Sequence, residues 1–339
     1  MKIIMVDQDS SFDGNSYRSE PLGGTESAFV CLAEALSKLG HLVIAATKIK
    51  HAIKIEGVSW LPITSEFEEC DIYICNRAPE LLSKAPINSK KVLWLHNPGN
   101  YLKKLKNIKK LLFNDLVLVC SGDYHFQTIP FWLKNRTVKV PLGLPDEIFK
   151  FSRDYKDIPE PISVFSSNPE RGLIWLSQLW KEKISIKIPS SKLLLFAGYE
   201  TYGGRKKSLI KNILQNVKNL NSSNIEINKP IKKKELFKKI FFSRIMLYRG
   251  DVGETFCLSV AEAQGLGVPA VVKSVGSLPE RVVHNVTGFV VNNDDEFVRS
   301  ATAILTDDEL WKKMSNNCMK IQRENSWAKV AKEFIAAVI

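Results

Sequence analysis

Residues 2–47, KIIMVDQDSSFDGNSYRSEPLGGTESAFVCLAEALSKLGHLVIAAT, contain one strand–helix–strand pattern. The apolar runs 2–6 and 42–47 have the length of buried strands, and the residues between them include a helical pattern over about 25–39. One face of this helix carries Ala28, Leu32, Ala35, Leu36 and Leu39. A strand, a helix and a second strand in this order predict a parallel pair joined by a crossover helix.

The same alternation continues through the chain. Further strand candidates are DIYIC (71–75), KVLWLH (91–96), LVLVC (116–120), ISVFS (162–166), KLLLFAG (192–198), IEI (225–227), RIMLY (244–248), PAVVK (269–273) and GFVV (288–291). Helical patterns separate them, so we expect an α/β protein with parallel sheets, which bind ligands at the carboxyl ends of their strands.

The pattern divides into two halves. A stretch rich in Pro and charge, residues 141–162, is typical of an interdomain connection. We expect one Rossmann-like domain over 1–150 and a second over 151–325. The amphipathic end, SWAKVAKEFIAAVI (326–339), predicts a last helix that packs near or onto the first domain.

Composition narrows the class of protein. With 339 residues and 25% charged residues, the chain is long enough for two globular domains. We expect a cytoplasmic protein, because no apolar window approaches the roughly 18 residues of a membrane span and the N-terminus has no signal-peptide pattern. The six dispersed cysteines predict reduced, buried thiols: Cys31, Cys70, Cys75, Cys120, Cys257 and Cys318.

Lysine clusters produce the net charge of +12. Residues 102–112 form a basic amphipathic pattern, in which we expect Leu102, Leu105, Ile108 and Leu111 on one helical face. An anionic membrane surface is one candidate partner for this helix, and an ordinary solvated lysine face is the alternative. A second cluster, from Lys229 to Phe242, predicts the solvated side of a core helix. Nucleic acid is disfavoured as a partner, because no known binding motif occurs.

The segment GETFCLSVAEAQGLGVP (253–269) contains two glutamates, Glu254 and Glu262. If both lay on a helix, about 1.5 Å of rise per residue would separate them by roughly 12 Å. Carboxylate pairs that hydrolyse glycosides lie closer, at about 5 to 9.5 Å. This spacing therefore favours two acids that hold opposite ends of one long ligand, with the helix N-terminus available for an anion. A nucleotide diphosphate sugar has that shape.

Glycines near the first helix form another candidate site. Gly23 and Gly24 lie where a loop meets the helix, so backbone N–H groups could approach a phosphate or sugar, and Thr25 could cap the helix. A plain glycine turn is the alternative. Asp7 and Asp9 form a DxD triplet, a pattern that can hold a divalent metal and a sugar diphosphate, but no further ligand follows at suitable spacing. We expect no metal and no resident cofactor.

Four basic or aromatic residues follow predicted strands. His96 ends the run 91–96 and is a candidate for a hydrogen bond to sugar, although a histidine satisfied by backbone is equally consistent. Arg171 suits bidentate contact to phosphate, with a surface arginine as the alternative. Arg249 is a second candidate for the diphosphate, and Arg205 is a weaker one among adjacent charges.

Together, these residues carry a family resemblance. The run from Gly253 to Val291 resembles the donor-binding signature of retaining glycosyltransferase family 4, with two glutamates eight positions apart, a Gly-x-Pro turn and later PE and TGF elements. Residues 22–43 resemble that family's opening GG loop and helix, LWLHNPG its His-bearing strand, and VKVPLGLPDEIF the end of its first domain. The resemblance implies the GT-B fold, two Rossmann-like domains facing across a cleft, of which the first (1–150) would bind the acceptor and the second (151–325) the nucleotide sugar.

The resemblance also implies roles. Glu254 would face the donor hexose and Glu262 the ribose hydroxyls. Phe256, Cys257 and Leu258 would offer backbone N–H groups, and Gly24 would lie against the diphosphate. His96 would touch the sugar, Arg171 would neutralise the departing diphosphate, and Glu280 would order the loop 276–281. The donor would be a nucleotide diphosphate sugar, with UDP-hexose favoured.

Several positions depart from the family pattern. Ser166 stands where the family's arginine falls, Arg171 replaces a lysine, and Cys257 replaces a glycine. Arg249 and Gly250 replace a common Pro-Ser pair. We expect Arg249 or Arg205 to supply the missing positive charge.

The predicted activity is metal-independent retaining hexosyl transfer to a glycan or lipid-linked hydroxyl, in lipopolysaccharide core or another surface polysaccharide, by an enzyme in the cytoplasm or on the inner face of the membrane. A nucleotide-sugar epimerase of similar build and an inactive donor-binding subunit of a larger assembly are the alternatives.

Overall fold

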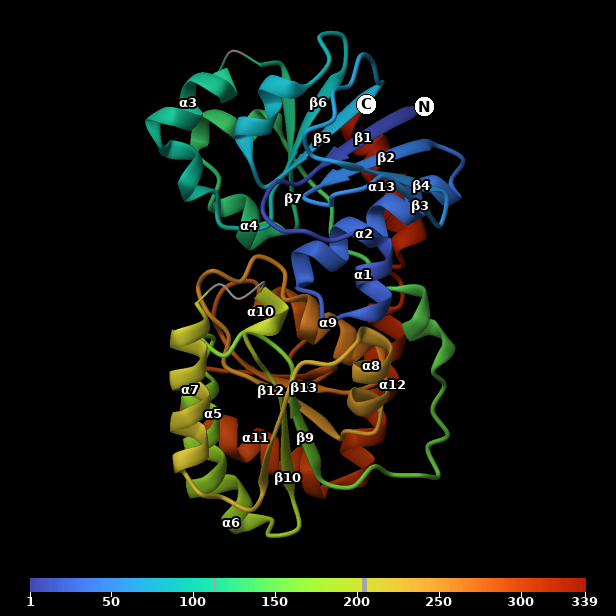
Figure 1. The fold of residues 1–339 in the computed structure, drawn as a ribbon. Coiled ribbons are helices and arrows are strands. Elements are labelled where there is room, and N and C mark those ends of the chain that lie inside the picture. The colour runs from blue at the N-terminus through green and yellow to red at the C-terminus, as the bar shows by residue number, and fades with distance from the viewer. Residues whose placement is uncertain (113, 203–205) are drawn as a thin grey trace. The chain divides into compact units, whose positions relative to one another are not determined.

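The structure of the protein is a computed structural model that describes residues 1–112, 114–202 and 206–339. Within these ranges the chain divides into two units, which Figure 1 shows as ribbons and which are described separately below. Unit 1 contains Met1–Ser19, Gly24–Gly143 and Asn325–Ile339. Unit 2 contains Glu20–Gly23 and Leu144–Glu324. The division therefore falls at Gly143 and Glu324 rather than at the expected positions 150 and 325, and the segment 20–23 groups with unit 2.

Unit 1 is built on one sheet of order β3-β4-β2-β1-β5-β6-β7-β8. Its pairings are parallel except for β3 with β4, which is antiparallel. The strands are β1 (Lys2–Val6), β2 (Leu42–Thr47), β3 (Ile53–Ile55), β4 (Val58–Pro62), β5 (Ile72–Asn76), β6 (Lys90–Trp94), β7 (Leu116–Cys120) and β8 (Thr137–Lys139). The helices are α1 (Gly14–Ser19), α2 (Gly24–Lys38), α3 (Leu105–Leu112), α4 (Asp123–Gln127) and α13 (Trp327–Val338), with 3-10 turns η1 (Pro79–Lys84), η2 (Gly99–Lys103) and η3 (Phe131–Arg136).

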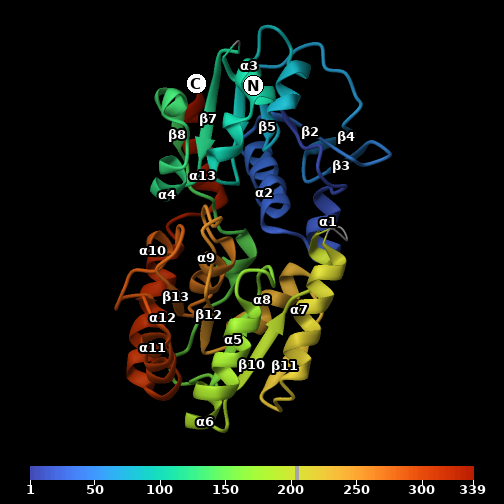
Figure 2. The same ribbon diagram turned by 90° about the vertical axis from the view of Figure 1, so that its left-hand side faces the viewer.

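Unit 2 has a parallel sheet of order β11-β10-β9-β12-β13-β14. Figures 1 and 2 show helices on both faces of this sheet. The strands are β9 (Ile162–Phe165), β10 (Lys192–Phe196), β11 (Ile225–Asn228), β12 (Ile245–Tyr248), β13 (Ala270–Lys273) and β14 (Gly288–Val291). The helices are α5 (Leu173–Leu179), α6 (Ser185–Lys187), α7 (Lys207–Asn219), α8 (Lys233–Phe241), α9 (Leu258–Gly265), α10 (Leu278–Arg281), α11 (Asp294–Thr306) and α12 (Asp308–Gln322), with 3-10 turns η4 (Asp146–Lys150) and η6 (Glu200–Tyr202) and a π-helical turn η5 (Trp180–Ile184).

Helix α13 contacts α2 within unit 1, although the whole of residues 144–324 separates the two in sequence. Trp327 and Phe334 of α13 lie edge-on to Trp94 at the end of β6, with ring centroids 6.5 and 5.7 Å apart. The side chain of Ser326 caps the helix by accepting a hydrogen bond from the Lys329 N–H. The last helix is thus part of the first unit's core.

Helix α3 differs from its predicted phase. Leu102 lies in the preceding 3-10 turn, and Leu105 begins the helix with 85% of its side chain exposed. The buried residues of the helix are Leu111, which was predicted on the apolar face, and Asn107, which was not. The exposed side of the helix carries Leu105 and Leu112, seven positions apart, so its apolar stripe points partly outward.

Two smaller expectations also change. Helix α2 begins at Gly24, so Thr25 lies in its first turn rather than at the N-cap position. All six cysteines are free thiols, of which Cys31 and Cys70 are only half-buried. Across the described ranges, no helix combines the length and apolarity needed to cross a membrane.

Candidate functional site

Arg171 and Glu254 form the centre of the candidate site in unit 2. The Arg171 Nη1 group donates to Glu254 Oε1 at 2.5 Å. Arg171 lies between β9 and α5, and Glu254 lies in the loop after β12. Because β9 and β12 are neighbours in the sheet, their carboxyl ends bring the two residues to one edge. The structure therefore joins two residues that were predicted separately.

Tyr248 completes this centre. Its hydroxyl donates to the same oxygen, Glu254 Oε1, and accepts a hydrogen bond from the Ser167 hydroxyl at 3.1 Å. Tyr248 is the last residue of β12 and is fully buried. Glu254 is therefore fixed by a charged donor and a neutral donor from two adjacent strands.

Electrostatics at this centre are dominated by burial. Burial raises the pKa of the Glu254 carboxyl, while Arg171 and the Tyr248 hydroxyl oppose the rise. Burial also acts to lower the pKa of Arg171, but the negative charge of Glu254 more than reverses this and raises it. The Tyr248 hydroxyl has a pKa well above its ordinary value, again chiefly because it is buried. We infer that the Arg171 guanidinium stays charged and that its charge favours the ionised form of the Glu254 carboxyl.

The backbone of the Glu254 loop is held by the loop after β13. The Ser277 N–H donates to the Glu254 carbonyl at 3.1 Å. Gly276 has φ +60°, and a Cβ there would lie 2.7 Å from the Asp251 carbonyl oxygen. A glycine is needed here because the two loops approach too closely for a side chain. Within the loop, Glu280, to which we assigned an ordering role, donates its N–H to the Ser277 carbonyl.

The side chain of Arg249 lies against Gly172, the residue that follows Arg171. A Cβ on Gly172, whose φ is +97°, would lie 2.7 Å from the Arg249 side chain. The Arg249 Nε donates to the Gly250 carbonyl at 3.4 Å. A second cation therefore stands near Arg171. At the position of that arginine, the buried Ser166 hydroxyl has no hydrogen-bond partner among the described residues.

The residues before α9 adopt an unusual backbone. Cys257, at the N-cap of α9, has φ 65° and ψ 68°, which is left-handed and favours glycine. Leu258 is the first residue of the helix, and Phe256 is buried beneath the Arg281 guanidinium at 4.2 Å from its ring centroid. Only Glu262 lies on the helix, so the helical estimate of 12 Å between the two glutamates does not apply.

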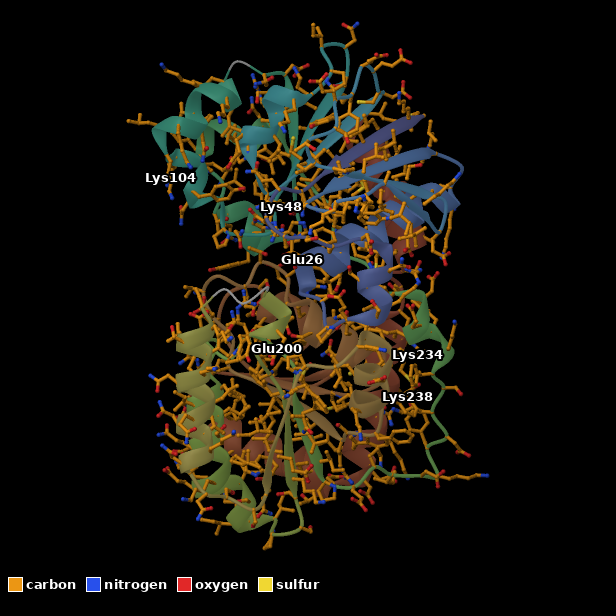
Figure 3. All side chains as sticks on the ribbon, viewed as in Figure 1. Glu26, Lys48, Lys104, Glu200, Lys234 and Lys238 are labelled. Atoms are coloured by element: carbon orange, nitrogen blue, oxygen red, sulfur yellow. The ribbon has the colours of Figure 1, made fainter. Side chains whose placement is uncertain are left out.

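Glu262 is paired with Lys233, the first residue of α8. The lysine Nζ lies 2.6 Å from Glu262 Oε1 and 2.8 Å from Oε2. The prediction that the second lysine cluster is a solvated face is wrong for this residue, because only 11% of its side chain is exposed. It is correct for Lys234 and Lys238, which Figure 3 labels on α8 and which are exposed.

In unit 1, the carboxyl ends of β1, β5 and β6 carry the other candidates. Asp7 is buried and accepts from Arg77 and from the Asn76 amide, each at 2.6 Å. His96 follows β6 by two residues, and its ring lies 4.4 Å from that of Trp94. Burial, aided by the nearby Arg77, holds the pKa of His96 well below its ordinary value, so the ring is neutral.

Three predicted site residues remain: Gly23, Gly24 and Arg205. Gly24 begins α2 in unit 1, and Gly23 belongs to the segment grouped with unit 2. Arg205 lies outside the described residues. Tyr248, Lys233 and Arg281 were not predicted. Tyr248 could have been suspected, since a polar end to the apolar run 245–248 marks the carboxyl end of a strand.

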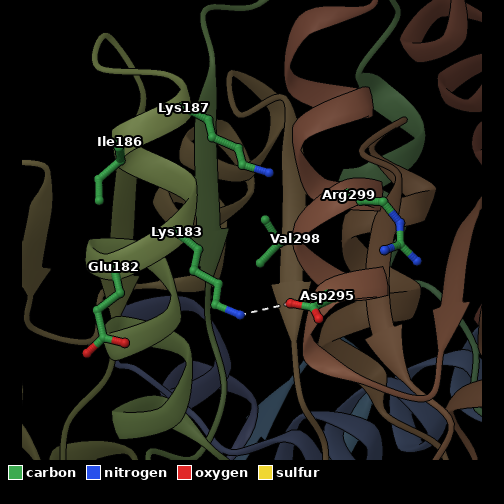
Figure 4. A pocket seen from close by; sticks show the side chains of 7 residues that line it. All are labelled: Glu182, Lys183, Ile186, Lys187, Asp295, Val298 and Arg299. Atoms are coloured by element: carbon green, nitrogen blue, oxygen red, sulfur yellow. Dashed lines mark hydrogen bonds and ion pairs between the residues drawn. The ribbon is translucent and has the colours of Figure 1, made fainter.

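A separate pocket of about 390 Å³ lies between η5, α6 and α11 (Figure 4). Lys183 Nζ and Asp295 Oδ1 pair in its wall at 2.8 Å. The pocket is lined by Glu182, Lys183, Ile186, Lys187, Asp295, Val298 and Arg299. None of these lining residues belongs to the candidate site, so we place no substrate there.

Solved structures share this fold over the whole chain. A sucrose-phosphate synthase from Thermosynechococcus elongatus superposes with a TM-score of 0.79 at 16% identity, covering 99% of this chain and 98% of that one. HepE of Anabaena, solved with UDP and glucose, has a TM-score of 0.75 at 14% identity, with 100% and 99% covered. The expected α/β class and GT-B fold are confirmed.

Curated relatives match over shorter stretches. An uncharacterized glycosyltransferase of Methanocaldococcus jannaschii is 32% identical over 104 residues, 30% of this chain and 27% of the relative. A D-inositol 3-phosphate glycosyltransferase of Corynebacterium efficiens is 36% identical over 80 residues, 23% of this chain and 19% of the relative. The aligned part thus spans about a quarter or less of each relative's length.

The family model described as glycosyl transferases group 1 matches residues 146–320, which is more than half of the chain and includes Arg171, Glu254 and Glu262. This protein belongs to the glycosyl transferases group 1 family.

Proposed function

We propose that this protein is a metal-independent, retaining hexosyltransferase. It moves a hexose from a nucleotide diphosphate sugar, with UDP-hexose favoured, to a hydroxyl of a glycan or lipid-linked acceptor. The observation that carries the proposal is the pair of Arg171 and Glu254 at one sheet edge, directly before α9. The guanidinium has donors beyond the one on Glu254, and a helix N-terminus favours an anion. The presence of UDP and glucose in the HepE structure supports this choice of donor.

In the proposed reaction, the bond between the sugar C1 and the leaving diphosphate oxygen breaks, and its electron pair stays on that oxygen. Arg171 and Arg249 neutralise the charge of the leaving group. In other enzymes a divalent metal has this role. The acceptor hydroxyl attacks C1 from the same face, and its proton passes to a phosphate oxygen. Glu254, held by Arg171 and Tyr248, orients the hexose hydroxyls. His96 is proposed to hydrogen-bond the sugar in its neutral form.

A donor screen tests the proposal first. Thermal shift with UDP, GDP and ADP sugars identifies the donor, because a bound ligand stabilises the folded protein by RT ln(1 + [L]/Kd) and so raises the melting temperature. Release of the nucleoside diphosphate is then followed with glycan acceptors, and NMR of the product gives the anomeric configuration. We expect retention, unchanged rates in EDTA, and a kcat reduced about 100-fold in Arg171→Ala.

Four results would overturn parts of the proposal. An inverted product would exclude the retaining reaction, and loss of activity in EDTA that Mg²⁺ restores would exclude metal independence. Interconversion of free nucleotide sugars without transfer would identify an epimerase. Donor binding without turnover, in the presence of any glycan acceptor, would identify a binding subunit.

We also propose that α3 docks the protein on an anionic membrane, at the cytoplasmic face, where a lipid-linked acceptor such as lipopolysaccharide core or another surface glycan is built. Leu105 and Leu112 are 85% and 54% exposed on one side of the helix. Exposed lysines flank them, including Lys104, which Figure 3 labels. Each lysine near an anionic surface contributes about 1 kcal/mol, and inserted leucines add to this.

Vesicle sedimentation tests the membrane proposal. Wild type should bind vesicles that contain phosphatidylglycerol more tightly than neutral phosphatidylcholine vesicles, and Leu105→Ser with Leu112→Ser should lose most of this binding. Replacing exposed lysines of α8, such as Lys238→Ser, serves as the matched control. Equal binding by all variants would exclude α3 as the docking element.

A further inference from the structure

The ammonium group of Lys233 donates hydrogen bonds to both carboxylate oxygens of Glu262. The two distances, 2.6 Å to Oε1 and 2.8 Å to Oε2, show that Nζ contacts both oxygens. Glu262 is 2% exposed, and helix α8 packs against α9 so that the two side chains meet in the interior of unit 2. The Lys233 ammonium also lies 5.6 Å from the Phe237 ring centroid, one turn along α8.

Burial of this ion pair costs folding free energy. A lysine in the first turn of a helix opposes the helix dipole, and both charges lose water on burial. Apolar side chains of similar volume often stabilise a core as well as a buried ion pair does. The neighbouring lysines of α8, Lys234, Lys238 and Lys239, are all exposed. Stability alone therefore does not account for the one lysine that turns inward to Glu262.

The geometry leaves the carboxylate able to bind a ligand. An ionised carboxylate has about four acceptor positions, and Lys233 uses one on each oxygen. The ammonium fixes the rotamer of Glu262, and each oxygen keeps an acceptor position. Two adjacent hydroxyl groups can donate to these two oxygens at once. A cis-diol is the chemical group that fits.

Resting on the proposed function, we propose that Lys233 is a positioning residue that aims Glu262 at the 2′- and 3′-hydroxyls of the donor ribose. Lys233 itself does not touch the nucleotide. Without it, nothing fixes the rotamer of the carboxylate, which then ceases to accept both hydroxyl hydrogens. The consequence is a site that distinguishes ribonucleotides from 2′-deoxyribonucleotides through a residue on a neighbouring helix.

Calorimetric binding of UDP, GDP and ADP, each against its 2′-deoxy form, tests this. Wild type should bind the preferred ribonucleotide at least about tenfold more tightly than its deoxy form, since a hydrogen bond to a charged group is lost. In Lys233→Met, ribonucleotide affinity should fall about tenfold and deoxynucleotide affinity much less, so that the preference disappears. KM for the donor should rise while kcat changes little. Lys233→Arg should restore most of the preference, and Lys234→Met, an exposed change one residue away, should leave it intact.

A second set of variants guards against a folding defect, because Lys233→Met leaves an unpaired carboxylate. The double variant Lys233→Met with Glu262→Gln has neither charge of the pair, and its preference should equal that of Glu262→Gln alone. If the double variant has the lower preference, the lysine contacts the ribose directly and the positioning role is wrong. If Lys233→Met weakens both nucleotides equally, Lys233 is only structural. If wild type binds no nucleoside diphosphate, the proposed function fails and the inference fails with it.

Discussion

Cys257 stores backbone strain at the start of α9. Its φ of 65° is a conformation that costs an L-residue about 1 to 2 kcal/mol and glycine almost nothing. The Sγ atom lies 3.6 Å from the Ser259 hydroxyl, and the side chain is buried. The strain is tolerated because the loop and the helix on either side determine the backbone here.

Substitutions at Cys257 should separate backbone strain from side-chain packing. Cys257→Gly relieves strain but adds about 0.4 to 1 kcal/mol of unfolded-chain entropy, so its unfolding free energy should stay within about 1 kcal/mol of wild type. Cys257→Val, β-branched at positive φ, should lose more than about 2 kcal/mol. Urea denaturation measures both. A valine variant as stable as the glycine variant would mean that the left-handed backbone is wrong.

His125 links two loops of unit 1 and should make its stability pH-dependent. Its Nδ1 accepts from the Ser121 N–H at 3.1 Å, and its Nε2 donates to the Asn97 carbonyl at 2.9 Å. Burial lowers the pKa of His125 to about 4, against the opposing effect of the Asn97 carbonyl. An ordinary histidine in the unfolded chain has a pKa near 6.5, so the unfolded state takes up a proton first as the pH falls.

Stability due to His125 is therefore fully present above pH 6.5 and is lost between pH 6.5 and 4. The loss should amount to about 2 kcal/mol between pH 7 and pH 5. Measured by denaturant unfolding, the difference between wild type and His125→Gln should shrink by this amount over that range. His96, whose pKa is also lowered, is present in both proteins, so its contribution cancels apart from the smaller repulsion that it shares with His125. A difference that does not change with pH would contradict the neutral, buried state of His125.

At the scale of the element, α13 contributes more to unit 1 than its position in the chain suggests. Its buried side chains are Trp327, Val330, Ala331, Phe334 and Val338. Phe334→Ala should lower the unfolding free energy by about 3 to 5 kcal/mol, because it removes a large ring from the contact with Trp94. Lys332→Ala, exposed on the same helix, should change it by less than about 0.5 kcal/mol. Similar effects of the two changes would show that α13 is not packed as described.

At the scale of the whole molecule, the chain begins and ends in the same unit. Truncation after Glu324 should therefore destabilise unit 1 while leaving the sheet of unit 2 intact. Calorimetry should show one transition at a much lower temperature and a second that the nucleoside diphosphate still raises. Removal of Ile339 alone, an exposed residue, is the control. A single transition shifted as a whole would show that the two units unfold together.

Local pattern was sufficient for much of the fold. Apolar runs of strand length occur at β1, β2, β5, β6, β7 and every strand of unit 2, and the helical period over residues 25–39 matches α2 closely. The short strands β3, β4 and β8 were missed because three to five residues, partly exposed, carry little periodic signal. The phase of α3 was wrong for Leu105, which is exposed, because a helix of eight residues fits more than one apolar stripe.

The candidate site could likewise be predicted only in part. Place along the chain made Arg171, Arg249 and Glu254 candidates, since each follows a predicted strand, and the motif around them added Glu262 in the helix that comes next. Their partners depended on which strands and helices are neighbours in space. The order β9 beside β12 joins Arg171 to Glu254 and Tyr248, and the packing of α8 on α9 turns Lys233 inward. Periodicity reports the environment of one element at a time, whereas these contacts arise between elements up to 83 residues apart, so only the folded chain specifies them.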